Sequence, residues 1–103
     1  MAKKIIWLKN AEIQMFSIMG YYQERNKSKI YSEKLYREIT QKIKKLDSKV
    51  AFPQKTSIKN LYYFTHKHIS VFFSITKTEI IVKLIWDERR NPQNLNSNLE
   101  EID

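Results

Sequence analysis

Residues 79–86, EIIVKLIW, are the longest strongly apolar stretch of this 103-residue chain. The side chains of a β-strand alternate between the two faces of a sheet; here one alternating set is entirely apolar, and the other also contains two isoleucines, Ile81 and Ile85. A strand of this kind needs cover on both sides, as in the middle of a sheet or under a layer of helices. The rest of the chain therefore has to supply neighbouring strands and an apolar layer.

Two amphipathic helices are predicted in the first half of the chain. Apolar side chains recur at helical spacing from residue 11 to about residue 24, and again from about residue 29 to residue 47. The expected inner faces consist of Ala11, Met15, Ile18, Met19 and Tyr22 in the first helix and of Leu35, Ile39, Ile43 and Leu46 in the second. Because only the polar segment 25–29 separates them, the two helices should form a hairpin.

Strand patterns appear before and after the two helices. Residues 3–8, KKIIWL, precede them, and residues 60–64, 69–75 and 79–86 follow them. Short connections allow the last three strands to form a meander, and residues 3–8 should join the same sheet as 79–86. The predicted fold is α+β: a small, largely antiparallel sheet with the helical hairpin packed on one face.

Length and composition indicate one domain. Residues 1–95 are expected to form it, and residues 96–103 to be a flexible acidic tail. No cysteine is present, which excludes disulfides and thiolate chemistry and suits a reducing cytosol. Neither a signal peptide nor the roughly 18 apolar residues that span a bilayer can be found. We therefore expect a cytoplasmic protein without a membrane partner.

The charge of the chain is strongly basic. The formal net charge is +8, and it rises to +11 without the three acidic residues among the last four. A surface of this sign attracts nucleic acid or an acidic protein partner. The alternative is a basic, soluble surface without a special partner.

Three stretches resemble the RelE/ParE family of type II toxins. They are IIWLKNA (residues 5–11), YYQERNKSKIYSEKL (21–35) and TEIIVKLIWDERRNP (78–92). Members often begin with a strand ending in W-S-x-x-A and close with a strand running into a W/H-x-x-R-Q-[ND]-P-like turn. The resemblance covers residues 3–95. It implies a growth-inhibiting toxin of the plasmid-stabilisation type, held inactive by a co-expressed acidic antitoxin, with no cofactor.

The resemblance implies one of two activities. ParE-like members poison DNA gyrase, whereas RelE-like members cut messenger RNA in the ribosomal A site, and the fold does not decide between them. Arg89 occupies the place of the family's terminal-strand arginine, but Asp87 occupies a place where several members have histidine. Because Asp87 removes an acid or base suited to neutral pH, we favour ParE-like target inhibition. A ribosome-dependent, metal-independent endoribonuclease and a non-toxic basic binding module are the alternatives.

The candidate site residues follow from this choice. If the chain is a ribonuclease, the catalytic candidates are Arg89, His66, Lys67 and His68; the candidates for binding a target or nucleic acid are Arg89, Arg90, Lys59 and Lys67. His66 and His68 are two residues apart, so both should point the same way if they lie on a strand. The alternative is two solvent-exposed turn histidines.

Two further expectations concern ligands and partners. Two histidines without an evident third ligand do not indicate a metal site. Residues 62–64, YYF, cannot all point inward, so we expect an exposed aromatic side chain there that contacts the antitoxin.

Overall fold

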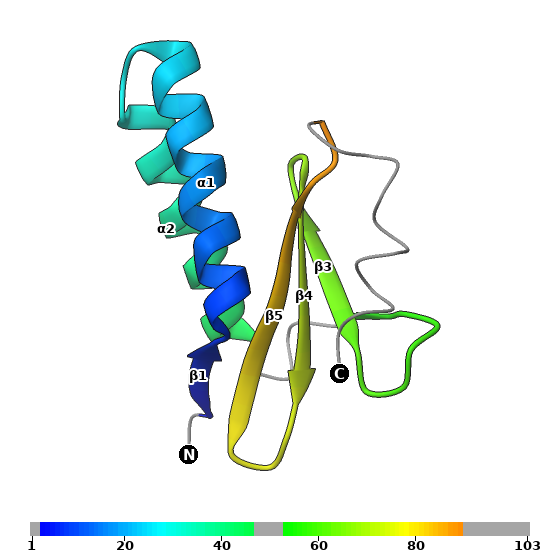
Figure 1. Cartoon of the computed structure of the whole chain (residues 1–103). Helices are drawn as coiled ribbons and strands as arrows, with labels where there is room; N and C mark the ends of the chain where they lie inside the picture. The colour runs from blue at the N-terminus through cyan, green and yellow to red at the C-terminus, as the bar shows by residue number, and fades with distance from the viewer. Residues whose placement is uncertain (1–2, 47–52, 90–103) are drawn as a thin grey trace.

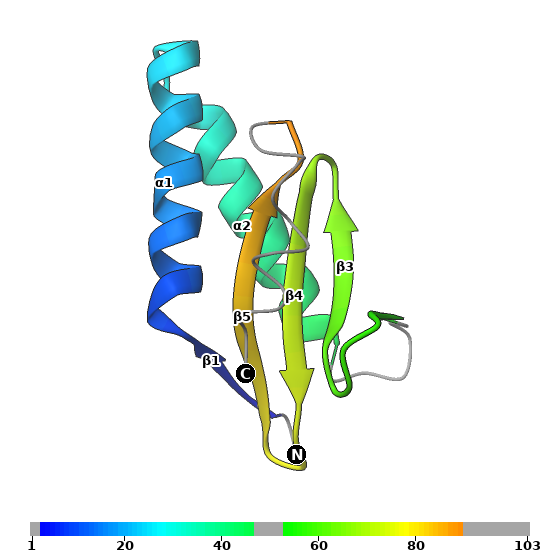
Figure 2. The same cartoon turned by 45° about the vertical axis from the view of Figure 1, so that its right-hand side comes forward.

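The computed structural model describes residues 3–46 and 53–89. The order of elements is β1 (Lys4–Trp7), α1 (Lys9–Asn26), α2 (Ile30–Lys45), β2 (Gln54–Lys55), β3 (Tyr62–His66), β4 (Ile69–Ile75) and β5 (Glu79–Asp87). The strands form one five-stranded sheet in the order β1-β5-β4-β3-β2. Both helices lie on one side of this sheet (Figures 1 and 2). The predicted α+β fold is therefore confirmed, and among the described residues the short β2 is the strand that the sequence pattern did not indicate.

The apolar strand β5 lies inside the sheet, as its composition predicts. β1 pairs with it in parallel through Lys4–Trp7 and Glu79–Val82, and β4 pairs with it antiparallel along its other side. Residues 3–8 and 79–86 thus share one sheet, as expected. Within the described part of the chain, neither helix is long and apolar enough to cross a membrane.

The main core fills the space between the helices and the sheet. The predicted inner faces of both helices contribute to it. The buried residues are Ala11, Met15, Ile18, Tyr22, Leu35, Ile39 and Ile43, and Met19 and Leu46 are partly buried against them. The opposite face of the sheet carries a smaller cluster of Leu61, Phe72, Leu84 and Trp86. Both faces of β4 and β5 are therefore covered by apolar contacts.

The aromatic residues 62–64 are not the exposed surface that we expected. Tyr62 and Phe64 pack against the main core, and Tyr63 packs against the cluster on the opposite face. All three are partly buried. The expectation of an exposed aromatic here is wrong because a sheet with apolar clusters on both faces gives each successive side chain something to pack against.

A β-bulge in β5 determines which way the end of the strand faces. Phe73 pairs with Val82, whereas the preceding Phe72 pairs with Leu84, so β5 has an extra residue, Lys83, at this point. A bulge of one residue reverses the alternation of faces beyond it. Val82 and Ile85 consequently both belong to the main core. Asp87, two residues after Ile85, lies on this same helix-facing side.

Candidate functional site

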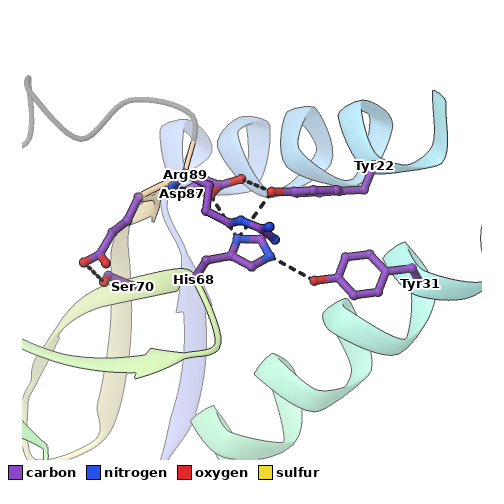
Figure 3. Close-up of polar contacts among 7 residues, drawn as sticks. Tyr22, Tyr31, His68, Ser70, Asp87 and Arg89 are labelled. Atoms are coloured by element: carbon purple, nitrogen blue, oxygen red, sulfur yellow. Dashed lines mark hydrogen bonds and ion pairs between the residues drawn. The ribbon is translucent and has the colours of Figure 1, made fainter. Parts of the chain in front are cut away.

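A polar cluster lies where β5 ends, beside the turn between β3 and β4 (Figure 3). Tyr22 of α1, Tyr31 of α2, His68 of the turn, Asp87 of β5 and Arg89 just after it form the cluster, which we call the Asp87 cluster. Its side chains come from four segments that are far apart in the sequence. They meet because the helical hairpin and the sheet end at the same side of the molecule (Figure 1).

Asp87 is the buried centre of the cluster, with 5% of its surface exposed. Its Oδ2 accepts a hydrogen bond from the Tyr22 hydroxyl at 2.9 Å. Its Oδ1 lies 3.0 Å from the His68 ring nitrogen Nδ1 and accepts a further bond from the Arg89 backbone N–H at 3.0 Å. A buried carboxylate is costly without partners, and three donors compensate this one.

His68 connects Asp87 to the second helix. Because a carboxylate can only accept, the contact with Asp87 places a proton on Nδ1. The other ring nitrogen, Nε2, lies 2.9 Å from the Tyr31 hydroxyl, so in the neutral ring it accepts the Tyr31 proton. Asp87, His68 and Tyr31 thus form a continuous hydrogen-bonded chain. Both nitrogens of the imidazole are engaged within the protein.

Tyr22 is held in its protonated form by the same surroundings. Burial, the hydrogen bond to Asp87 and the negative charge of Asp87 together raise the pKa of Tyr22 to about 12, with the charge of Arg89 acting in the opposite direction. The Tyr22 hydroxyl is therefore a donor to Asp87 throughout the neutral range. It also lies 3.4 Å from the His68 Nδ1.

A second, smaller polar group surrounds Glu38 on α2. The His66 Nε2 lies 2.9 Å from the Glu38 Oε1, and the Lys67 Nζ lies 3.6 Å from the same oxygen. The pKa of Glu38 is lowered, chiefly by the hydrogen bond from His66 and also by the charge of Lys67, while burial acts against the shift. Lys67 also places its Nζ 5.5 Å from the centre of the Tyr31 ring.

The two histidines are therefore not exposed turn residues. Their side chains are 14% and 11% exposed for His66 and His68 respectively. Both reach partners on the helices, although His68 lies in the turn after β3 and not on a strand, and each has a different set of partners. The tight turn makes this possible: Lys67 takes a backbone φ of 56°, a left-handed conformation that residues other than glycine adopt infrequently.

The remaining predicted site residues are spread over a wider area. Arg89 is exposed and adjoins the Asp87 cluster through its backbone. Lys59 is exposed in the segment before β3, at the opposite end of that strand from His66 and Lys67. Arg90 and the expected acidic tail, 96–103, lie outside the described residues. In the part of the chain that the structure describes, no three His, Cys, Asp or Glu side chains group together as metal ligands would.

Two members of the Asp87 cluster, Tyr22 and Tyr31, were not expected in a site, because they appeared in the sequence only as residues of amphipathic helices. Asp87 was considered there because it lies in the closing motif, where it replaces a histidine. A histidine is nevertheless present at this place, because the imidazole of His68 lies against Asp87. The available signal was that Tyr22 and Tyr31 lie on either side of the interhelical turn, which brings both to the same end of the hairpin.

Comparison with known proteins supports the fold. No protein-family model and no curated protein matches this chain. Among solved structures, it is similar to a chain of "Chromosomal ParDE TA system from P. aeruginosa", with a TM-score of 0.69 and 16% identity over 82% of this chain and 94% of that one. This chain has the RelE/ParE toxin fold. At 16% identity the similarity describes the fold alone, because one fold can carry unrelated functions.

Proposed function

We propose that this chain is the toxin of a type II toxin–antitoxin system, neutralised by a co-expressed acidic antitoxin. The supporting observation is the structural similarity to a chain from a ParDE system, which extends over 94% of that chain. The net charge of +8 suits an acidic partner. In this proposal the toxin acts in the cytosol on an essential protein, and DNA gyrase is the first candidate because of the resemblance to ParE-like members.

The Asp87 cluster favours a binding role over a chemical one. Both nitrogens of His68 have partners inside the protein, and Tyr22 and Asp87 are buried. Acid–base catalysis needs a group that can exchange a proton with substrate, and none of these three meets that need. Their contacts instead tie both helices to the end of β5. This fixes the start of the segment that carries Arg89, whose exposed side chain is then available to a target.

The two proposed activities predict different results in a DNA gyrase supercoiling assay and in an assay of messenger RNA cleavage. We expect the purified chain to block supercoiling by DNA gyrase, and brief induction in cells to stop growth without cuts in translated messages, as measured by primer extension. Codon-phased cuts together with normal supercoiling would reverse the choice of activity. Normal growth with neither effect would leave the non-toxic basic module as the better account.

Ribosome-dependent RNA cleavage is the second candidate, and one observation favours it. A carboxylate that orients an imidazole, whose other nitrogen faces a hydroxyl, is the arrangement used to activate hydroxyl groups. Here the hydroxyl is that of Tyr31, which is partly exposed and lies beside the cationic Lys67. In this candidate Tyr31 accepts the proton of the ribose 2′-OH and passes its own to His68. Lys67 and Arg89 supply positive charge for the phosphate.

Removal of single groups separates the two candidates. If RNA is cut, we expect Tyr31→Phe and Arg89→Ala each to slow cleavage by about 100-fold or more, through loss of the acid–base hydroxyl and of a phosphate cation. If the toxin only binds gyrase, Tyr31→Phe should leave inhibition close to that of the wild type. Tyr36→Phe, which removes the hydroxyl of another exposed tyrosine of α2 outside the Asp87 cluster, is the matched control. The rates are read from primer extension and from the supercoiling assay.

A further inference from the structure

Exposed lysine side chains gather at one end of the molecule, opposite the end that carries the Asp87 cluster. At this end lie the start of β1, the last turn of α2, β2 with the loop that follows it, and the turn between β4 and β5 (Figures 1 and 2). The sheet register agrees, since Lys4 pairs with Glu79 at the start of β5 and Lys55 pairs with Tyr62 at the start of β3. The exposed lysines on these segments, which we call the lysine end, are Lys4, Lys44, Lys55, Lys59 and Lys77.

Direct contacts hold several of these segments together. The Lys3 Nζ at the start of β1 donates a hydrogen bond to the Lys77 carbonyl in the turn between β4 and β5 at 3.0 Å. Lys44 in the last turn of α2 lines the same cavity as Ile5 of β1. The lysine end is therefore carried by parts of the fold whose relative positions are fixed.

The loop between β2 and β3 forms a polar hollow beside two of these lysines. A cavity of about 280 Å³ is lined by residues 55–62, which include the exposed Lys55 and Lys59. The Thr56 Oγ1 accepts a hydrogen bond from the Ile58 backbone N–H at 3.0 Å, which holds the loop in a defined shape. The hollow is large enough for a phosphate group between the two ammonium groups.

Acidic residues are distributed differently from the lysines. Of those that the structure describes, Glu79 lies at the lysine end and Glu12 lies in the first turn of α1. The other described acidic residues lie near the end of α1, on α2 before its last two turns and at the end of β5, and they are Glu24, Glu33, Glu38, Asp87 and Glu88. Within the described residues, positive charge therefore dominates the lysine end.

The residue types of the lysine end indicate the chemistry of its partner. Lysine binds phosphate as a point charge, and phosphate contacts carry no base sequence information. Single-stranded nucleic acid is usually held by aromatic side chains on which bases stack. The exposed large aromatic side chains of the described chain, Phe16, Tyr21 and Tyr36, lie on the helices, outside the segments of the lysine end. Duplex DNA, with closely spaced phosphates on two strands, suits lysines carried by several segments.

We propose that the lysine end binds the phosphate backbone of duplex DNA without regard to base sequence. This interaction goes beyond the proposed toxin function and does not depend on it, because it requires only the chain and DNA. If the toxin acts on gyrase, the exposed Arg89 and the lysine end lie at opposite ends of the molecule. They can then contact the enzyme and its DNA at the same time.

Fluorescence anisotropy of a labelled duplex of about 20 base pairs tests the proposal with the purified chain. If each lysine of the lysine end meets one phosphate, the logarithm of the association constant should fall against the logarithm of salt concentration with a slope of about −4.5. The affinity should then fall about 500-fold between about 50 and 200 mM salt. A duplex of scrambled sequence should bind equally well. A slope weaker than about −1 would overturn the proposal.

Two charge-reversed variants locate the binding surface. The first combines Lys55→Glu, Lys59→Glu and Lys77→Glu, and the second combines Arg25→Glu, Lys29→Glu and Lys34→Glu, all of them exposed positions. Both lower the net charge equally, but the second does so near the tip of the helical hairpin. At about 50 mM salt the first should bind DNA at least 100-fold more weakly, and the second should stay within about 5-fold of the wild type.

An equal loss of affinity in both variants would overturn the proposal, because net charge alone would then explain the binding. Thermal unfolding checks that both variants remain folded. The single substitution Lys59→Gln provides a milder variant, and it should weaken the salt dependence by about 0.9 in slope. A Lys59→Gln slope equal to that of the wild type would exclude Lys59 from the DNA contact.

Failure of DNA binding is distinguishable from failure of the toxin function. A chain that arrests growth but does not bind DNA contradicts the lysine end alone. A chain that binds DNA but does not arrest growth contradicts the toxin function alone. If the first variant kept its affinity for DNA and lost affinity for the acidic product of the adjacent reading frame, the lysine end would be a protein-binding surface, and the proposal would be overturned.

Discussion

Insertion of one alanine between Leu84 and Ile85 of β5 is expected to abolish cooperative unfolding, whereas deletion of Lys83 should retain it. Lys83 is the extra residue of the bulge, so its deletion restores regular alternation and leaves the following side chains on their present faces. The insertion instead shifts the strand by one residue and turns the following side chains to the opposite face. Ile85 and Asp87 would leave the helix-facing side, and Trp86 would enter it. If the strand instead shifted on the other side of the insertion, Ile80 and Val82 would be turned out of the core.

The expected size of this effect follows from what the end of β5 holds. Loss of the partners of a buried, paired charge costs about 3 to 5 kcal/mol. Forcing a tryptophan into a filled core adds about 1 to 3 kcal/mol. Together these approach the whole stability of a small domain, about 5 to 15 kcal/mol. Urea unfolding followed by circular dichroism measures it, and an insertion variant with a midpoint close to that of the wild type would show that the register at the end of β5 is not fixed.

The bulge also shows why the sequence could not predict on which face of the sheet the Asp87 side chain lies. Residues 79–86 carry apolar side chains in both alternating sets, so the pattern identifies a buried strand but does not show where its two faces exchange. The same property makes the strand easy to recognise. The inner faces of the two helices and the strand at residues 69–75 were predictable from the sequence because the polar and apolar sides of these elements differ.

The candidate site could be predicted only in part. Arg89 follows the last strand, and the spacing of His66 and His68 indicates a shared direction, so these features are visible in the sequence. Their partners are not, because Glu38 and Tyr31 lie on α2 and reach the histidines only after the helices pack on the sheet. Tyr22 and Tyr31 resemble ordinary core or surface positions until the two ends of the helical hairpin are placed in space. The backbone conformation at Lys67 likewise has no clear signal in its residue type.

Replacement of Asp87 by alanine is expected to lower the free energy of unfolding by about 3 to 5 kcal/mol. The change leaves the Tyr22 hydroxyl and the His68 Nδ1 without their acceptor in a buried place, where each unsatisfied group costs about 1 to 3 kcal/mol. Asp87→Asn should be less destabilising, because it retains one acceptor oxygen. Urea unfolding at neutral pH gives both values. A loss below about 1 kcal/mol for Asp87→Ala would mean that the cluster contributes little to stability.

The same substitution should change how stability depends on pH in the alkaline range. The pKa of Tyr22 is raised from its ordinary 10.0 to about 12, so its contribution is fully present below pH 10 and is lost as pH rises towards 12. A difference of this size between the pKa of Tyr22 in the folded and in the unfolded chain corresponds to about 2 to 3 kcal/mol of stability lost over this pH range.

In Asp87→Ala the hydrogen bond and the negative charge disappear while burial of Tyr22 remains. The pH range over which the Tyr22 contribution is lost should therefore become narrower but should not vanish. Tyr22→Phe should lack it altogether, because phenylalanine does not titrate. Ultraviolet absorbance of the phenolate follows the titration directly, and an unchanged Tyr22 titration in Asp87→Ala would show that burial alone, without Asp87, holds the proton on Tyr22.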